Sequence, residues 1–151
     1  TVMVCLSKGL GAPVGSLLAG PRDLMDRAWR IRRRLGGGMR QSGFLAAAGI
    51  HALEHHRERL AEDHARARNL AEHASRIAGL SVVFPETNIV MLDLVEADLS
   101  VDDVLGTLAA EGVRMVKFGP RRIRAVTHLG VDDDGIERAL AALSLAVQGS
   151  P

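Results

Sequence analysis

One lysine near the beginning of the chain stands between an apolar segment and a glycine-rich segment. Residues 2–6 form a continuous apolar run, which predicts a strand covered on both faces. Lys8 follows this run and precedes Gly9, Gly11 and Gly15. An amine held in partly apolar surroundings favours its neutral form, which attacks carbonyl carbons, and glycines let a flat ligand approach the backbone. We therefore expect Lys8 to be a nucleophile that condenses with a carbonyl group.

The order of residues around Lys8 excludes two common glycine-rich motifs. In a P-loop the lysine follows the glycines, whereas Lys8 precedes them. A dinucleotide-binding motif opens a helix, whereas Pro13 and a second apolar run over residues 15–19 follow here. A lysine between a strand and a glycine turn is most often an ordinary solvated residue, so this turn alone does not identify a site.

Two arginines lie where an anion would bind. Residues 122–127 predict a strand, whose alternation puts Arg124 on the face opposite Ile123 and Ala125. Its guanidinium offers paired planar donors that match a carboxylate, although an exposed strand arginine without a ligand would give the same pattern. Arg40 follows the glycines at 36–38 and precedes a predicted helix, whose first amides favour an anion such as a phosphate.

Composition and charge narrow the possible partners. The net charge of +1 argues against general binding of polyanions. Arginines crowd residues 22–40, but the chain has only three Phe, one Trp and no Tyr to interleave with them. We therefore expect this segment to be a solvated helix face, with no nucleic-acid partner.

The cysteine and hydropathy patterns indicate the compartment. The single cysteine, Cys5, cannot form an internal disulfide and lies in an apolar run, which favours packing in a reducing, cytoplasmic environment. No apolar run approaches the ~20 residues of a membrane span, and no signal peptide is visible. We expect no membrane partner.

Histidines cluster on one predicted helix. His51 and His55 are four residues apart and share a helical face, with Glu54, His56 and His64 nearby. This spacing can bind zinc, but an HExxH pattern is missing. We expect a solvated face and no metal site.

Hydrophobic periodicity predicts an α/β order of elements. Strands are expected over residues 1–6 and 15–19, followed by a helix over 23–34 that ends at the glycine triplet. One long helix is expected from about residue 42 to about residue 77, because apolar residues recur at helical spacing. After residue 80, strands and helices alternate, with strands over 81–84, 88–94, 113–118 and 122–127 and helices over 101–111 and 134–147.

A second glycine-rich motif, LGGGMRQSG at residues 35–43, gives the Lys8 turn its context. CLSKGLGAPVGSLL precedes it, and RLAEDH, TNIVMLDL and IRAVTHLGVD follow it. In this order the segments resemble the C-terminal portion of the L-threonine aldolases of the low-specificity type. That family belongs to the fold type I pyridoxal-phosphate enzymes and to the β-eliminating lyases. The resemblance covers most of the 151 residues.

The resemblance implies part of an aspartate-aminotransferase-like α/β fold. Residues 1–55 would be the C-terminal part of the large domain that binds pyridoxal phosphate, residues 56–79 a linking helix, and residues 80–151 a small C-terminal α/β domain. Family members are more than twice as long, so we expect these residues alone to be an incomplete enzyme. The general base and the aromatic group that stacks on the cofactor ring would come from an N-terminal half.

The resemblance also implies an activity and its residues. The reaction would be cleavage of L-threonine and L-allo-threonine, small-molecule amino-acid substrates, to glycine and an aldehyde. Lys8 would hold pyridoxal 5'-phosphate, Ser7 and Arg40 would contact this cofactor, and Arg124 would bind the substrate carboxylate. The whole protein would be a cytoplasmic homo-oligomer, a dimer or a homotetramer. The alternatives are an aminotransferase or another β-eliminating lyase of fold type I, and a catalytically incomplete subunit or interaction module.

Overall fold

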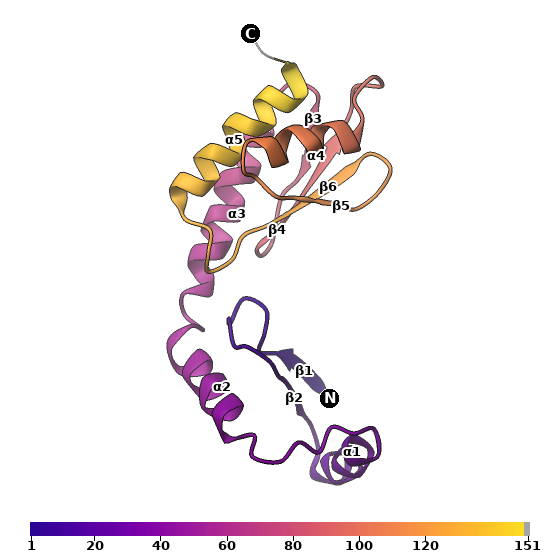
Figure 1. Cartoon of the computed structure of the whole chain (residues 1–151), viewed down its shortest axis with the longest axis vertical. Coiled ribbons are helices and arrows are strands. Elements are labelled where there is room, and N and C mark those ends of the chain that lie inside the picture. Colours follow the sequence, from indigo (N-terminus) through magenta and orange to yellow (C-terminus); the bar gives the residue numbers. More distant parts are fainter. Residues whose placement is uncertain (150–151) are drawn as a thin grey trace. The chain divides into compact units, whose positions relative to one another are not determined.

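The chain divides into two compact units after residue 60 (Figure 1). The computed structural model describes residues 1–149, so the last two residues of the predicted small domain, 80–151, lie outside the described residues. The first unit contains β1 (Val2–Cys5), β2 (Ser16–Ala19), α1 (Arg22–Arg34) and α2 (Gly43–His55). Among the described residues, none of the helices combines the length and the apolar character that a membrane span requires.

The first unit has a small core that lies beside its sheet. β1 and β2 pair antiparallel, with Cys5 opposite Ser16. The turn between the strands supplies most of the core, which consists of Leu6, Leu10, Ala12 and Ala52. Val2 and Met3 are 65% and 64% exposed, so the described residues do not supply the cover predicted for both faces of β1. Within the described residues, β1 pairs only with β2, and its side chains lie outside this core.

The long helix predicted from residue 42 to residue 77 is interrupted, so that prediction is wrong. α2 ends at His55, and α3 (Leu60–Ala74) begins after a turn. The ring of His56 donates its Nδ1–H to the carbonyl oxygen of Leu10 over 2.8 Å, which ties the end of α2 to the β1–β2 turn. Leu60 then packs on the small core. Tertiary contacts of His56 and Leu60 therefore override the helical periodicity.

The second unit is an antiparallel sheet covered by helices on one face. After α3 it contains β3 (Leu80–Val83), β4 (Ile89–Leu94), α4 (Val101–Ala110), β5 (Val116–Lys117), β6 (Arg122–Val126) and α5 (Asp133–Gln148). The strand order is β3-β4-β6-β5. The alternation of strands and helices predicted after residue 80 is confirmed, although the strand expected over 113–118 shortens to β5.

The core of the second unit lies between the three helices and one face of its sheet. Its most deeply buried large side chains come from α3, β4, α4, β6 and α5, and they are Leu70, Leu92, Leu108, Ile123 and Leu143. Because side chains alternate along a strand, the opposite face of the sheet carries the side chains of Val83, Met91, Val116 and Arg124 in one row. We call this opposite face the open face.

Thr127 fixes the end of β6 to two other segments. Its backbone N–H donates to the carbonyl of Asn88, and the amide nitrogen of Asn88 donates to the carbonyl of Thr127 over 2.7 Å. The buried hydroxyl of Thr127 donates to the backbone carbonyl of Asp63 in α3 over 2.6 Å. These bonds hold the strand that carries Arg124 against α3 and against the start of β4.

We expect the substitution Thr127→Val to lower the free energy of unfolding by about 1–3 kcal/mol, because the valine keeps the volume but removes a buried hydrogen bond. Denaturant unfolding of the full-length protein measures this change. The control is Thr107→Val, which removes a 3.2 Å bond to the carbonyl of Asp103 on an exposed part of α4. An equal loss in both variants would contradict the special role of Thr127.

Candidate functional site

The turn between β1 and β2 presents Lys8. Three backbone hydrogen bonds close this turn, from Leu6 N–H to Gly15, from Ala12 N–H to Leu6 and from Gly11 N–H to Lys8. Gly11 and Gly15 have φ values of 72° and 129°, which side chains rarely allow. Lys8 is exposed, so the partly apolar surroundings predicted for it are not found within this unit. Its amine is therefore held on a fixed backbone and is accessible.

Ser7 contacts the cysteine of β1. The Oγ atom of Ser7 lies 3.3 Å from the Sγ atom of Cys5. The hydroxyl and the backbone N–H of Ser7 stabilise the thiolate, and with smaller contributions from Ser16 and Lys8 they hold the pKa of Cys5 below its ordinary value. Ser7 thus offers a hydroxyl beside Lys8, at the position where the sequence predicted a cofactor contact.

The glycine segment 36–38 folds back onto the end of α1. The carbonyl of Gly37 accepts from the Nε atom of Arg32 over 2.6 Å, and its N–H donates to the carbonyl of Arg32 over 2.8 Å. Gly36 has a φ of 82°. Arg40 is exposed in the loop before α2, which begins at Gly43. The turn at Gln41, with a φ of 48°, separates Arg40 from that helix.

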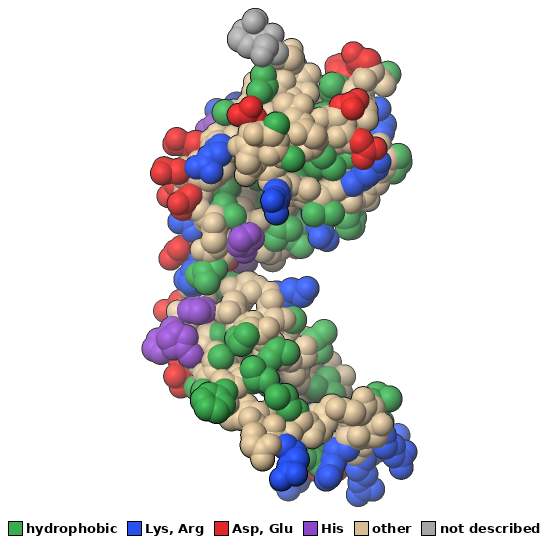
Figure 2. Space-filling model, viewed as in Figure 1, with side chains coloured by type: hydrophobic (Ala, Val, Ile, Leu, Met, Phe, Trp, Pro, Cys, Tyr) green, Lys and Arg blue, Asp and Glu red, His purple; other side chains and the backbone are tan. Residues whose placement is uncertain are grey.

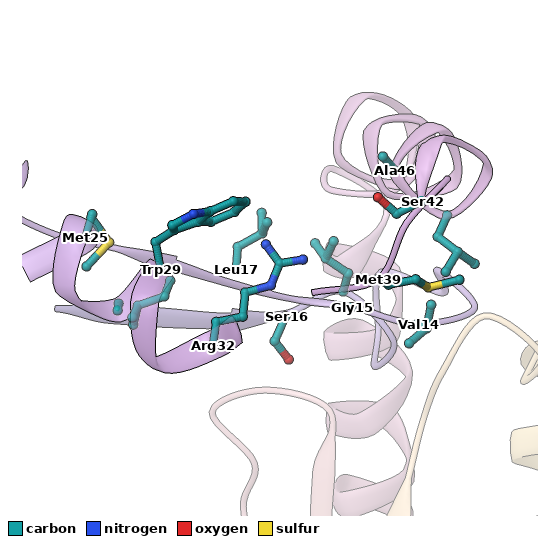
Figure 3. A pocket seen from close by; sticks show the side chains of 14 residues that line it. Val14, Gly15, Ser16, Leu17, Met25, Trp29, Arg32, Met39, Ser42 and Ala46 are labelled. Atoms are coloured by element: carbon teal, nitrogen blue, oxygen red, sulfur yellow. The ribbon is translucent and has the colours of Figure 1, made fainter. Parts of the chain in front are cut away.

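An apolar hollow of about 700 Å³ lies in the first unit (Figure 3). Its walls come from the β1–β2 turn, β2, α1, the loop before α2 and α2 itself, and they include Leu17, Trp29 and Met39. The guanidinium of Arg32 lies 5.0 Å from the centre of the Trp29 ring. Neither Lys8 nor Arg40 lines this hollow, although Val14 and Gly15 of the turn that presents Lys8 do.

Charged and titratable side chains also gather on α1 and α2. Basic side chains gather over α1, which buries none of its residues (Figure 2). The rings of His51 and His55 lie 4.4 Å apart, as their helical spacing predicted, and both are exposed. Within residues 1–149, no group of three or more His, Cys, Asp or Glu side chains is arranged to hold a metal ion.

Arg124 lies on the open face of the second unit, as predicted. Ile123 and Ala125 are buried on the other face, and Arg124 is half-buried. Its guanidinium carbon lies 5.3 Å from the centre of the Phe118 ring. Its Nε atom is buried and has no hydrogen-bond partner within the described residues. A buried donor without an acceptor is costly, so this side chain is suited to receive an anion.

The charge of the neighbouring arginine, Arg122, is compensated by a carboxylate of the same sheet. Arg122 stands opposite Asp93 and donates two hydrogen bonds of 2.7 Å to its carboxylate. This contact holds the pKa of Asp93 below its usual range. Arg124 stands opposite Met91, which has no charge. Of these two arginines, only Arg124 retains an uncompensated charge for a ligand.

The predicted site residues fall into both units. Ser7 and Lys8 are adjacent on one turn, and Arg40 belongs to the same unit of residues 1–60, whereas Arg124 belongs to residues 61–151. Sequence reasoning missed Phe118. A signal existed, because Gly119-Pro120 between two apolar runs predicts a hairpin that returns Phe118 toward the following strand.

We expect Ser7→Ala to raise the pKa of Cys5 toward its ordinary value, because the largest stabilisation of the thiolate is lost. The alkylation rate of the Cys5 peptide, followed against pH with iodoacetamide and mass spectrometry, would then rise at higher pH than in the unmodified protein. Ser16→Ala is the control and should cause a smaller shift, since Ser16 contributes less. A larger shift in the control would contradict the assigned contact.

Curated relatives match nearly the whole chain. The low specificity L-threonine aldolase of Escherichia coli (strain K12) is 44% identical over 138 residues, which cover 91% of this chain and 40% of that protein. Low-specificity L-threonine aldolase 1 of Arabidopsis thaliana is 35% identical over 150 residues, which cover 97% of this chain and 42% of that protein. The chain thus spans about 40% of the length of these relatives.

Solved structures match the fold. A Listeria monocytogenes protein assigned as an L-allo-threonine aldolase aligns with a TM-score of 0.73 at 20% identity, over 95% of this chain and 44% of that one. The ornithine aminotransferase of Toxoplasma gondii aligns with a TM-score of 0.70 at 14% identity, over 97% of this chain and 36% of that one. The chain therefore adopts part of the α/β, aspartate-aminotransferase-like fold. Because the model of the beta-eliminating lyase family matches residues 1–97, well over half of the sequence, the chain belongs to that family.

Proposed function

We propose that the protein carrying this chain is a pyridoxal-phosphate-dependent carbon–carbon lyase. It cleaves L-threonine and L-allo-threonine to glycine and an aldehyde, in the cytoplasm, as a homodimer or homotetramer. The observation that carries this proposal is the 44% identity to a protein named low specificity L-threonine aldolase. We further propose that residues 1–55 complete the cofactor-binding domain, that 56–79 link it to a small domain, and that 80–151 form that domain.

The residues of the first unit fit the cofactor. Lys8 offers an exposed amine on a backbone that three hydrogen bonds fix, and Ser7 offers a hydroxyl next to it. Lys8 would hold the aldehyde carbon of pyridoxal phosphate, and Ser7 and Arg40 would contact its phosphate. A charged donor such as Arg40 suits a phosphate. When bound, the cofactor withdraws electrons from the amino acid, so that the Cα–Cβ bond can break.

Arg124 fits the carboxylate of an amino-acid substrate. Its charge is not compensated by a carboxylate of the described residues, and its buried Nε lacks an acceptor. A planar guanidinium binds a carboxylate in a fixed orientation, unlike a lysine ammonium. Arg124 would therefore orient the substrate and select which bond at Cα breaks, which is a positioning effect.

We expect Lys8 to be the lysine that carries the cofactor. Borohydride reduction of the protein loaded with pyridoxal phosphate, followed by peptide mapping, should find the cofactor on Lys8. Lys117, the other lysine of the chain, is the internal control, since the Asp102 carboxylate lies 2.6 Å from its Nζ atom. Attachment to Lys117 with Lys8 unlabelled would refute the assignment.

We expect Arg124→Ala to reduce kcat/KM for L-threonine by a factor that corresponds to about 2–5 kcal/mol, because a partly desolvated, charge-assisted contact is lost. The absorbance of the bound cofactor should change little, since Arg124 is assigned to the substrate. Arg114→Ala, at an exposed arginine of the same unit, serves as the control. Near-native efficiency of Arg124→Ala would assign the carboxylate to another residue.

A further inference from the structure

Phe118 is placed beside Arg124 by the hairpin that joins β5 to β6. The backbone N–H of Phe118 donates to the carbonyl of Arg122 over 2.8 Å, which continues the pairing of the two strands by one residue. The Phe118 ring then lies 5.3 Å from the guanidinium carbon of Arg124. This distance is within the range of a cation–π contact.

The cross-strand neighbours of Arg124 do not hold its guanidinium by an ion pair. Across the sheet, Arg124 stands between Met91 of β4 and Val116 of β5, and neither side chain carries a charge or an oxygen acceptor. Arg122, on the same face, is instead held by two hydrogen bonds to Asp93. A long side chain without such bonds samples many rotamers, and binding an anion then costs entropy.

We propose that Phe118 is a positioning residue for Arg124. Its ring holds the guanidinium in one orientation through the cation–π contact, while the donors of the guanidinium stay available to a substrate carboxylate. This inference rests on the proposed function, in which Arg124 binds that carboxylate. Phe118 itself touches no substrate atom in this assignment.

If Phe118 positions Arg124, removing its ring should lower the affinity for ligands that have a carboxylate and spare those that lack one. A cation–π contact at a partly exposed site corresponds to roughly 3- to 10-fold in affinity. Phe118→Leu should weaken the binding of glycine by that factor. The binding of glycinamide, which lacks the carboxylate, should change less than about 2-fold. Phe118→Trp keeps an aromatic face and should bind glycine within about 2-fold of the unmodified protein.

The experiment uses the full-length protein loaded with pyridoxal phosphate. Calorimetry measures its dissociation constants for glycine and for glycinamide. This readout does not depend on turnover. Phe84→Leu is the matched control, because Phe84 is 57% exposed in the same unit, against 52% for Phe118. It should leave both constants unchanged. If Phe118→Leu does not fold, Phe118→Met replaces it, since methionine keeps bulk and apolar character.

The outcomes separate this inference from the proposed function. An equal change for glycine and glycinamide in Phe118→Leu, no change for either ligand, or a failure of Phe118→Trp to restore glycine binding would overturn the role of Phe118. Arg124→Leu should abolish the preference for glycine over glycinamide. If Arg124→Leu abolishes this preference and Phe118→Leu leaves its size unchanged, only the inference on Phe118 fails. If Arg124→Leu preserves it, the proposed carboxylate site fails as well.

Discussion

The antiparallel pairing of β4 with β6 determines the charge that the second unit presents. Its register places Arg122 opposite Asp93 and Arg124 opposite Met91. A shift by one residue would turn Arg122 and Arg124 toward the core and bring Ile123 and Ala125 onto the open face. The buried positions of Ile123 and Leu92 oppose such a shift, because both side chains are fully enclosed by the helices. Burial of Ile123 and Leu92 in the apolar core therefore fixes the face of the sheet on which Arg124 lies.

Both candidate regions combine a fixed backbone with an accessible polar end. In the first unit the backbone of the turn is closed by hydrogen bonds, and the amine of Lys8 extends from it into solvent. In the second unit Thr127 ties the end of β6 to α3 and to Asn88. A side chain on such a backbone loses less freedom when a ligand binds than a side chain on a mobile loop does.

Much of the second unit could be predicted from the sequence, because its elements follow local patterns. The alternation around Ile123 and Ala125 gave the correct face for Arg124, and apolar periodicity gave the strands and helices after residue 80. The first unit was less predictable. The end of α2 depends on a contact between His56 and Leu10, which are distant in sequence, and local propensity cannot predict such a contact. The apolar residues of β1 predicted burial, which depends on neighbours that a pattern does not identify.

The paired hydrogen bonds between Arg122 and Asp93 have a consequence for ligand binding. Asp93 is the diagonal neighbour of Arg124 across the β4–β6 pair, two residues from Met91, a separation that a long side chain can bridge. A carboxylate left free at that position would be an internal competitor for the same guanidinium. By donating to both oxygens of Asp93, Arg122 compensates the charge of that carboxylate and weakens its attraction for the guanidinium of Arg124.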